Sequence, residues 1–161
     1  MVAHYPVPIQ EDVRDLLTDL LGRGVAVDKV PPGAFDDGEP GAIAEFVTDE
    51  EATAALCVLD APFAVRVGAA LVMVPANVAE EDLASGDVPD HHLENVREVV
   101  NIFGRMLNSA TTPHVRLHGL HRWPGPLSEG VQALLEEPEF RRDFAVAVEG
   151  YGEGRFSILV A

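Results

Sequence analysis

Basic side chains are scarce in this chain of 161 residues: 11 Lys and Arg stand against 27 Asp and Glu, giving a formal net charge of −16. We therefore expect no nucleic acid as a direct ligand, because phosphate backbones call for clustered Lys and Arg. Binding to an anionic membrane surface is disfavoured for the same reason. The negative charge favours solubility. It would contribute to binding only if the partner has a basic surface.

Cysteine is almost absent, since Cys57 is the single one. An intramolecular disulfide and a cysteine-based zinc site are excluded, and the apolar run Ala54–Leu59 predicts an inert, buried thiol. Residues Met1–Gln10 lack a basic region followed by a hydrophobic stretch, so we expect no signal peptide. The apolar segment Ala61–Pro75 is short and contains Arg66, which favours a buried helix over a membrane span. We expect a cytoplasmic protein.

Apolar residues make up 47% of the chain, which is enough to build the core of one domain, 1–161. Asp60, Asp90 and Ser128 stand where helix N-caps are expected. Hydrophobic periodicity and turn residues predict the following elements: helices over Gln10–Leu21, Ala61–Val74, His91–Ala110 and from Ser128 to about Glu136; a short acidic helix or loop over Asn77–Ser85; strands over Val25–Val30, Ala42–Val47, Thr53–Leu59, Pro113–Leu120, Phe144–Val148 and Phe156–Val160; an exposed loop over Gly33–Gly41; and a structured turn over Arg122–Pro126. The strand Thr53–Leu59 is nearly all apolar and is expected to be central.

The predicted helix His91–Ala110 has two distinct faces. Its apolar residues recur at helical spacing and should face a core: Val96, Val99, Val100, Phe103, Met106, Leu107 and Ala110. Its polar residues form one seam along the same helix: Glu94, Glu98, Asn101, Arg105 and Asn108.

Glu98 and Asn101 are the pair in this seam that indicates a function. Three residues apart on a helix, a carboxylate and a carboxamide project side by side. The carboxylate accepts hydrogen bonds and carries charge, whereas the amide both donates and accepts. Such a pair can grip a cation and orient a water molecule, but it is not suited to nucleophilic attack.

The spacing extends beyond the pair. Pro124 follows Asn101 after twenty-two intervening residues, and Glu94 precedes Glu98 by four. This arrangement resembles the signature of the CheC/CheX/FliY chemotaxis phosphatases, in which Asp or Ser, then Glu-x-x-Asn, then a distant Pro define the active face. The matching segment, Glu94 to Pro124, spans about a fifth of the chain.

The resemblance implies an α+β fold, built from two pseudo-symmetric halves around a mainly antiparallel sheet flanked by helices. Some members carry an active Glu-x-x-Asn in both halves. Here the first helix has Glu11 followed three residues later by Arg14, so the second pair is missing. The resemblance is therefore to the single-site, CheX-like members.

The resemblance also implies a substrate: the aspartyl phosphate on the receiver domain of a response regulator. Asn101 would orient the attacking water, and Glu98 would dock against the receiver's active-site lysine. No metal or cofactor is expected in this chain, because the receiver carries its own Mg²⁺. Glu94, Arg105 and Pro124 are expected to contact the partner.

Two residues depart from the family pattern. Glu94 stands where these phosphatases usually have Asp or Ser, and Arg105 stands where they usually keep Gly. Arg105 could obstruct the partner, pair with Glu98 or Asn101, or contact a phosphoryl oxygen. These departures leave alternatives open: a catalytically degenerate module that binds a protein without hydrolysis, an unrelated acidic domain for a small molecule or peptide, or ordinary solvent-facing positions on an amphipathic helix.

Other patterns favour structural roles. His114, His118 and His121 suggest a metal site. On a strand, however, His114 and His118 would lie about 13 Å apart, which is too far for them to share an ion. His91 and His92 are expected to be exposed in the first turn of the helix 91–110. The glycines of 150–154 predict a hairpin turn, and Trp123 is expected to pack under the turn that carries Pro124.

The resemblance also implies that a dimer could form by the joining of two sheets. The last residues, Phe156–Ala161, form a predicted strand with no polar tail after it. We therefore expect that a homodimer could form through this strand as a sheet edge.

Overall fold

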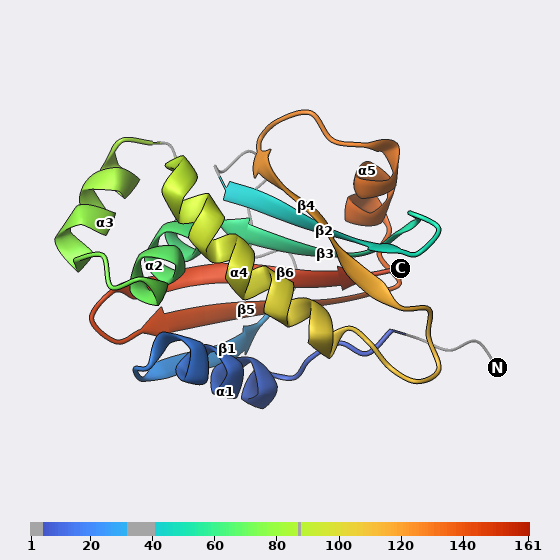
Figure 1. Ribbon diagram of the computed structural model, residues 1–161, viewed down its shortest axis with the longest axis horizontal. Coiled ribbons are helices and arrows are strands. Elements are labelled where there is room, and N and C mark those ends of the chain that lie inside the picture. The colour runs from blue at the N-terminus through green and yellow to red at the C-terminus, as the bar shows by residue number, and fades with distance from the viewer. Residues whose placement is uncertain (1–4, 32–40, 87) are drawn as a thin grey trace.

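The computed structural model describes residues 5–31, 41–86 and 88–161 (Figure 1). The expected loop Gly33–Gly41 lies outside these residues, apart from Gly41. In chain order the elements are α1 (Gln10–Leu21), β1 (Val25–Val30), β2 (Gly41–Thr48), β3 (Thr53–Asp60), α2 (Ala61–Leu71), α3 (Ala76–Ala84), α4 (Asp90–Met106), β4 (Val115–Trp123), α5 (Glu129–Glu136), β5 (Phe140–Val148) and β6 (Gly152–Val160). The predicted helices and strands are all present, although α2 and α4 end earlier than expected. Met73, with a backbone φ of 62°, lies just beyond the end of α2.

The strands form one antiparallel sheet of six, in the order β1-β5-β6-β3-β2-β4 (Figure 1). The sequence prediction that Thr53–Leu59 is a central strand is confirmed, because β3 pairs with β6 on one side and β2 on the other. The apolar character of this strand follows from its position, since both of its faces are covered.

The sheet order shows the expected pseudo-symmetry. One half is α1-β1-β2-β3 and the other is α4-β4-β5-β6. The equivalent strands are β1 and β4, β2 and β5, and β3 and β6. When the members of each pair are exchanged, the same strand order results, read from the opposite edge of the sheet. The outer strand of each half pairs with the other half: β1 lies beside β5, and β4 lies beside β2. The chain is therefore an α+β protein with two intertwined halves.

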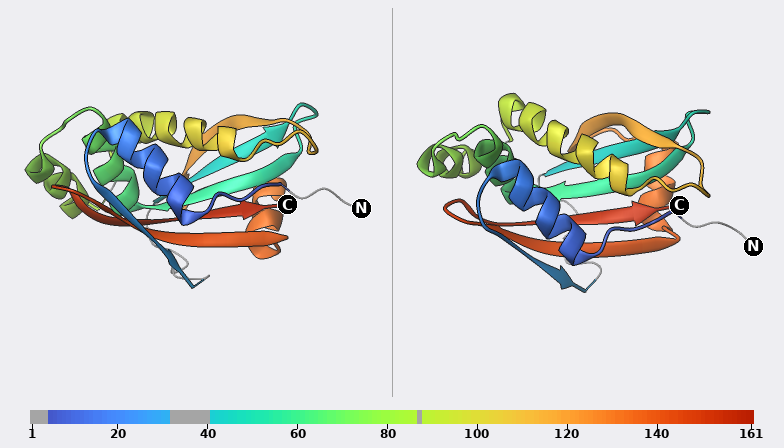
Figure 2. Two further views of the ribbon diagram at one scale, coloured as in Figure 1. Left: turned by 90° about the horizontal axis from the view of Figure 1, so that it is seen from below. Right: turned by 60° about the horizontal axis from the view of Figure 1, so that its bottom comes forward.

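Helices cover the sheet unequally (Figure 2). Helices α1, α2 and α4 lie on one face, and α5 lies on the other. The main core fills the space between the sheet and helices α1, α2 and α4. In this core Phe156 is surrounded by Phe63, Phe103 and Phe144, at ring-centroid distances of 5.0, 5.3 and 5.0 Å. A smaller apolar cluster lies under α5 and consists of Ile43, Leu56, Val131, Leu134 and Leu159. The larger core thus lies beneath α4, the helix that carries the Glu98 and Asn101 pair.

Two of the three predicted helix caps are confirmed. The carboxylate of Asp60 accepts a hydrogen bond from the Phe63 N–H at 2.8 Å, and the Ser128 hydroxyl accepts one from the Val131 N–H at 3.3 Å. The third prediction is wrong, because α4 begins at Asp90 itself and no side chain caps it. The Asp90 carboxylate is instead paired with a guanidinium from β4.

The proposed dimer edge needs a correction. Strand β6 is hydrogen-bonded to β5 on one side and to β3 on the other, so the terminal strand Phe156–Ala161 offers no free edge. The edge strands of this sheet are β1 and β4. Periodicity could not reveal this, because a buried central strand and an apolar edge strand have similar sequences.

The remaining expectations from composition concern Cys57 and membrane spans. The Cys57 side chain is buried, and burial raises the pKa of its thiol well above the ordinary value. None of the helices in the described part of the chain is long and apolar enough to cross a membrane.

Candidate functional site: the exposed face of helix α4

Helix α4 packs on α2, β4 and β2. The apolar stripe predicted from the sequence faces these elements, with Val96, Val99, Val100, Phe103 and Leu107 all buried. Met106 is half-buried, and Ala110 lies beyond the end of the helix and is exposed. The helix is therefore anchored along its full length, and its opposite face is free to present side chains.

Two glycines allow the close packing of α4. A Cβ atom on Gly68 of α2 would lie 2.7 Å from the backbone oxygen of His92, and one on Gly104 would lie 2.9 Å from the Phe46 ring. Both distances are shorter than ordinary carbon contacts, so neither position has room for a side chain. The backbone of α2 therefore lies directly against the backbone of α4 at Gly68, and the backbone of α4 lies against the Phe46 ring at Gly104. These two close contacts leave α4 little freedom to shift.

Strand β4 holds α4 at both ends. The Asn108 side chain, just after the helix, hydrogen-bonds the backbone of Val115, the first residue of the strand. At the other end of the strand, the Arg122 guanidinium donates to the Val88 carbonyl and to the Asp90 carboxylate. Asn108 thus has a structural role, although the sequence pattern placed it in the polar seam.

The other four residues of the seam, Glu94, Glu98, Asn101 and Arg105, are all exposed. Since each residue turns an α-helix by about 100°, Glu98 and Asn101 are separated by about 60° around the axis. Within residues 5–31, 41–86 and 88–161, neither side chain of this pair makes a hydrogen bond or an ion pair. An acid and an amide therefore stand side by side, both accessible to a second molecule.

Arg105 follows Asn101 by four residues and lies on the same side of the helix. The sequence left open whether it pairs with Glu98 or Asn101. In the described structure it makes no ion pair or hydrogen bond with either, and it is exposed. Its guanidinium is therefore available to a partner, and it is also bulky enough to hinder one.

Pro124 lies at the end of β4, directly after a cis peptide bond to Trp123. The strand is longer than predicted, so Arg122 and Trp123 belong to it and the turn begins at Pro124. Trp123 packs against the apolar cluster under α5, and its expected packing under the turn that carries Pro124 stays a prediction. Asp90, which pairs with Arg122 of β4, precedes Glu98 by eight residues, or about 12 Å along the helix axis. Pro124 is exposed, and its contact with a partner stays a prediction.

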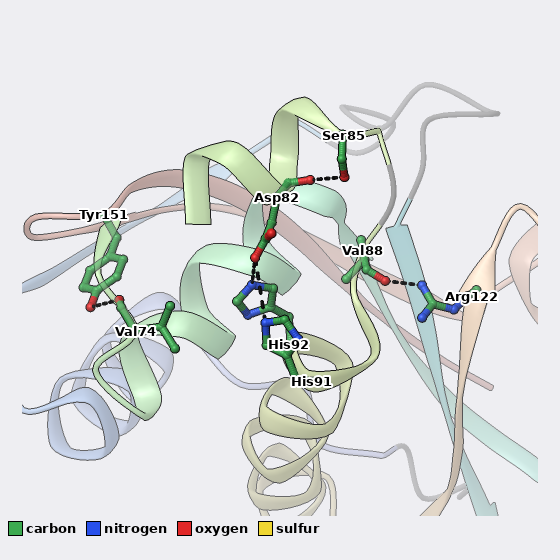
Figure 3. A network of polar contacts seen from close by, with 8 residues as sticks. All are labelled: Val74, Asp82, Ser85, Val88, His91, His92, Arg122 and Tyr151. Atoms are coloured by element: carbon green, nitrogen blue, oxygen red, sulfur yellow. Dashed lines mark hydrogen bonds and ion pairs between the residues drawn. The ribbon is translucent and has the colours of Figure 1, made fainter. Parts of the chain in front are cut away.

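The histidines differ most from expectation. In the part of the chain that the structure describes, His114, His118 and His121 do not form a group able to share an ion. His91 is exposed as predicted, but His92 is completely buried, so that prediction is wrong. The His92 ring points back toward α3, where its Nε2 atom lies 2.7 Å from the Asp82 carboxylate (Figure 3). The two adjacent histidines were visible in the sequence, but nothing in the sequence indicated that Asp82 would join them.

The hairpin turn between β5 and β6 consists of residues 149–151, and the rest of the glycine-rich segment, from Gly152 to Gly154, is already paired with β5 as the start of β6. Gly150 and Gly152 have φ values of 83° and 110°, which side-chain-bearing residues rarely adopt. The prediction of a turn here is confirmed.

Comparisons with known proteins give a fold. No family model matches the chain, and no curated protein matches it in sequence. Solved structures do match. FliY from Thermotoga maritima aligns over 92% of this chain and 82% of its own, with a TM-score of 0.57 and 15% identity. FliM in a FliG–FliM complex from H. pylori aligns over 94% and 85%, with a TM-score of 0.61 and 10% identity. The chain has a CheC-like fold.

A third structure is similar over nearly the whole of both chains. It is the CheX–CheY–BeF3–Mg complex from Borrelia burgdorferi, with coverage of 93% and 93%, a TM-score of 0.52 and 13% identity. FliY, the FliM middle domain and CheX thus share the CheC-like architecture that the Glu98 and Asn101 motif indicated. At these identities the likeness concerns the fold, and the function has to be argued from the site.

Proposed function

We propose that this CheC-like protein is a phosphatase that accelerates hydrolysis of the aspartyl phosphate of a response-regulator receiver domain. The observation that carries the proposal is the exposed, unpaired Glu98 and Asn101 pair on the rigid helix α4. A further support is that a CheX of the same fold was solved bound to CheY with BeF3 and Mg²⁺. By analogy, the receiver would bring its own metal ion, and this chain would supply neither metal nor cofactor.

In the proposed reaction a water molecule attacks phosphorus, and the bond between phosphorus and the aspartyl oxygen breaks. The products are the receiver's free carboxylate, inorganic phosphate and a proton. The Asn101 amide oxygen would accept a hydrogen bond from the water and hold it in line with the bond that breaks. An amide is not basic enough to remove the proton, so Asn101 acts by orientation.

Glu98 would hold the partner in place. Its exposed carboxylate could pair with the receiver's active-site lysine, and such a charge-assisted contact also fixes the register of docking. Glu94, one turn earlier on the same side, adds a second negative charge to this surface. The net charge of −16 would favour a positively charged patch on the partner.

The proposal is tested by following phosphate loss from a set of phosphorylated receivers, with and without the purified protein. For the receiver that responds, Asn101→Ala should abolish most of the acceleration. Positioning of a reacting group contributes factors of about 100 or more. Glu98→Ala should mainly weaken binding, so its rate should recover when the concentration of either protein is raised.

Gln132→Ala is a matched control, because it also removes an exposed carboxamide from a helix. Gln132 lies on α5, on the opposite face of the sheet. This variant should retain full activity. Undiminished acceleration by Asn101→Ala would contradict the proposed role of the pair.

A second candidate function is a binding module without hydrolysis. It is favoured by the free Arg105 side chain beside Asn101, and by FliM proteins of this fold that were solved in complexes with FliG and with SpeE. Tight binding of a receiver with no change in the lifetime of its phosphate would support this function. A homodimer joined through the true edge strands β1 or β4 stays a proposal, which sedimentation would test.

A further inference from the structure

The first turn of α4 and the helix before it bring together three side chains that can bind metals. His91 and His92 lie on α4, and Asp82 lies on α3 (Figure 3). One ligand atom from each lies within 4.8 Å of the other two. This is the only such group of three or more among the residues that the structure describes. We propose that Asp82, His91 and His92 bind a divalent transition-metal ion, with Zn²⁺ as the best match.

The distances fit a tetrahedral ion after small movements. Metal–ligand bonds of about 2.0–2.1 Å place neighbouring ligand atoms about 3.3 Å apart in a tetrahedral zinc site. The Asp82 Oδ2 atom lies 2.7 Å from His92 Nε2 and 3.8 Å from His91 Nε2. One distance must therefore open by about 0.6 Å and the other must close by about 0.5 Å. Asp82 and His91 can make these movements, because their side chains are 26% and 57% exposed.

His92 provides the fixed ligand. Its side chain is completely buried, and its backbone is held against Gly68 of α2. The Nδ1 atom is buried and has no hydrogen-bond partner in the described structure, so Nε2 makes the only polar contact of the ring. That atom points at the Asp82 carboxylate, where the ion would bind. The His91 ring lies beside it, with centroids 4.1 Å apart.

The ligand types select the metal. Two imidazoles and one carboxylate suit zinc and its neighbours in the first transition row, whereas Mg²⁺ and Ca²⁺ require sites made mainly of oxygen atoms. Three protein ligands leave a fourth position for water or for a group from another molecule. His91 precedes Glu98 by two helical turns, so the backbone positions of these two residues are separated by about 10 Å along the helix axis. The ion would also link α3 to α4. This proposal revises the sequence-based expectation that the chain holds no metal, and it does not depend on the phosphatase proposal.

The test uses the full chain without a histidine tag, stripped of metal with a chelator. Calorimetric titration with Zn²⁺ should show stoichiometric binding, and the melting temperature should rise with Zn²⁺ but not with Mg²⁺. Co²⁺ in place of zinc should give the intense visible absorption of a tetrahedral site. His91→Ala should weaken zinc binding by roughly 100-fold, because it removes one of three ligands.

Two further variants keep the result interpretable. Asp82→Asn retains a hydrogen-bond acceptor for the buried His92 and should also weaken zinc binding, while the protein stays folded. His118→Ala removes an exposed histidine from β4 and should leave the affinity unchanged. The absence of stoichiometric binding would overturn the proposal. So would an equal loss of affinity in His118→Ala and His91→Ala, since surface histidines in general would then account for the binding.

Discussion

The Asn108 side chain satisfies both backbone hydrogen-bonding groups of Val115. Its Oδ1 atom accepts from the Val115 N–H at 2.8 Å, and its Nδ2 atom donates to the Val115 carbonyl at 3.1 Å. Nδ2 also lies 3.1 Å from the Gly104 carbonyl in the last turn of α4. One amide thus joins the end of the helix to the beginning of β4.

Asn108→Ala is therefore expected to destabilise the protein. The variant loses these bonds and leaves partly buried backbone groups without partners, which costs about 1–3 kcal/mol in the free energy of unfolding. Urea denaturation measures the loss. Asn101→Ala is the matched control, because it truncates the same residue type at an exposed position and should change stability by less than about 0.5 kcal/mol. Equal stability of the two variants would contradict the structural role of Asn108.

On the proposed phosphatase function, Arg105→Ala should increase the rate of receiver dephosphorylation. The side chain is long, exposed and four residues from Asn101, at a position where the phosphatases that this chain resembles usually keep Gly. Truncation should open the surface around the pair without cost to the helix, since Ala is a strong helix former. The measurement is the rate of phosphate loss at several concentrations of the variant. A slower reaction would show instead that the guanidinium contacts the phosphoryl group.

Gly68→Ala should destabilise the protein, although alanine usually favours a helix over glycine by about 1 kcal/mol. The added methyl group would lie 2.7 Å from the His92 carbonyl oxygen, so α2 and α4 would have to separate. Overpacking of this kind costs about 1–3 kcal/mol, which outweighs the gain in helix propensity. Urea denaturation of the variant checks the sign. A variant as stable as the parent would show that the two helices can move apart freely.

Cys57 should not react with thiol reagents while the protein is folded. Its side chain is buried, and burial raises the pKa of the thiol, so the reactive thiolate does not form at pH 8. Reaction with a chromogenic disulfide should appear only in denaturant, and Cys57→Ala provides the blank. The unfolded thiol ionises near pH 8.5 and the folded one does not, so this residue lowers stability as the pH rises above about 8.5.

Local patterns in the sequence predicted the elements of this fold well. The apolar stripe of α4 and the alternation in β5 and β6 arise from the side of each element that meets the core, and this information is local. The cap at Asp60 and the turn at Gly150 follow from backbone chemistry within a few residues. The exposure of Glu98 and Asn101 was predictable for the same reason, because they lie opposite a continuous apolar stripe.

Features that depend on distant contacts were not predictable. The sequence of β6 does not show that β3 lies beside it, because strand order depends on how the chain crosses over. The burial of His92 depends on α3 folding back to bring Asp82 to its ring. Asp90 could cap a helix in isolation, but Arg122 from β4 takes its carboxylate. In each case a partner on a different helix or strand determined the outcome.

The pairing of β1 with β5 and of β4 with β2 has a consequence for folding. A fragment holding only α1 through β3 would leave its first strand without its neighbour, and the complementary fragment would have the same defect. Either piece could complete its sheet only by borrowing a strand from another molecule, as domain-swapped dimers do. The protein should consequently melt in a single cooperative transition, and neither half should survive alone as a stable monomer.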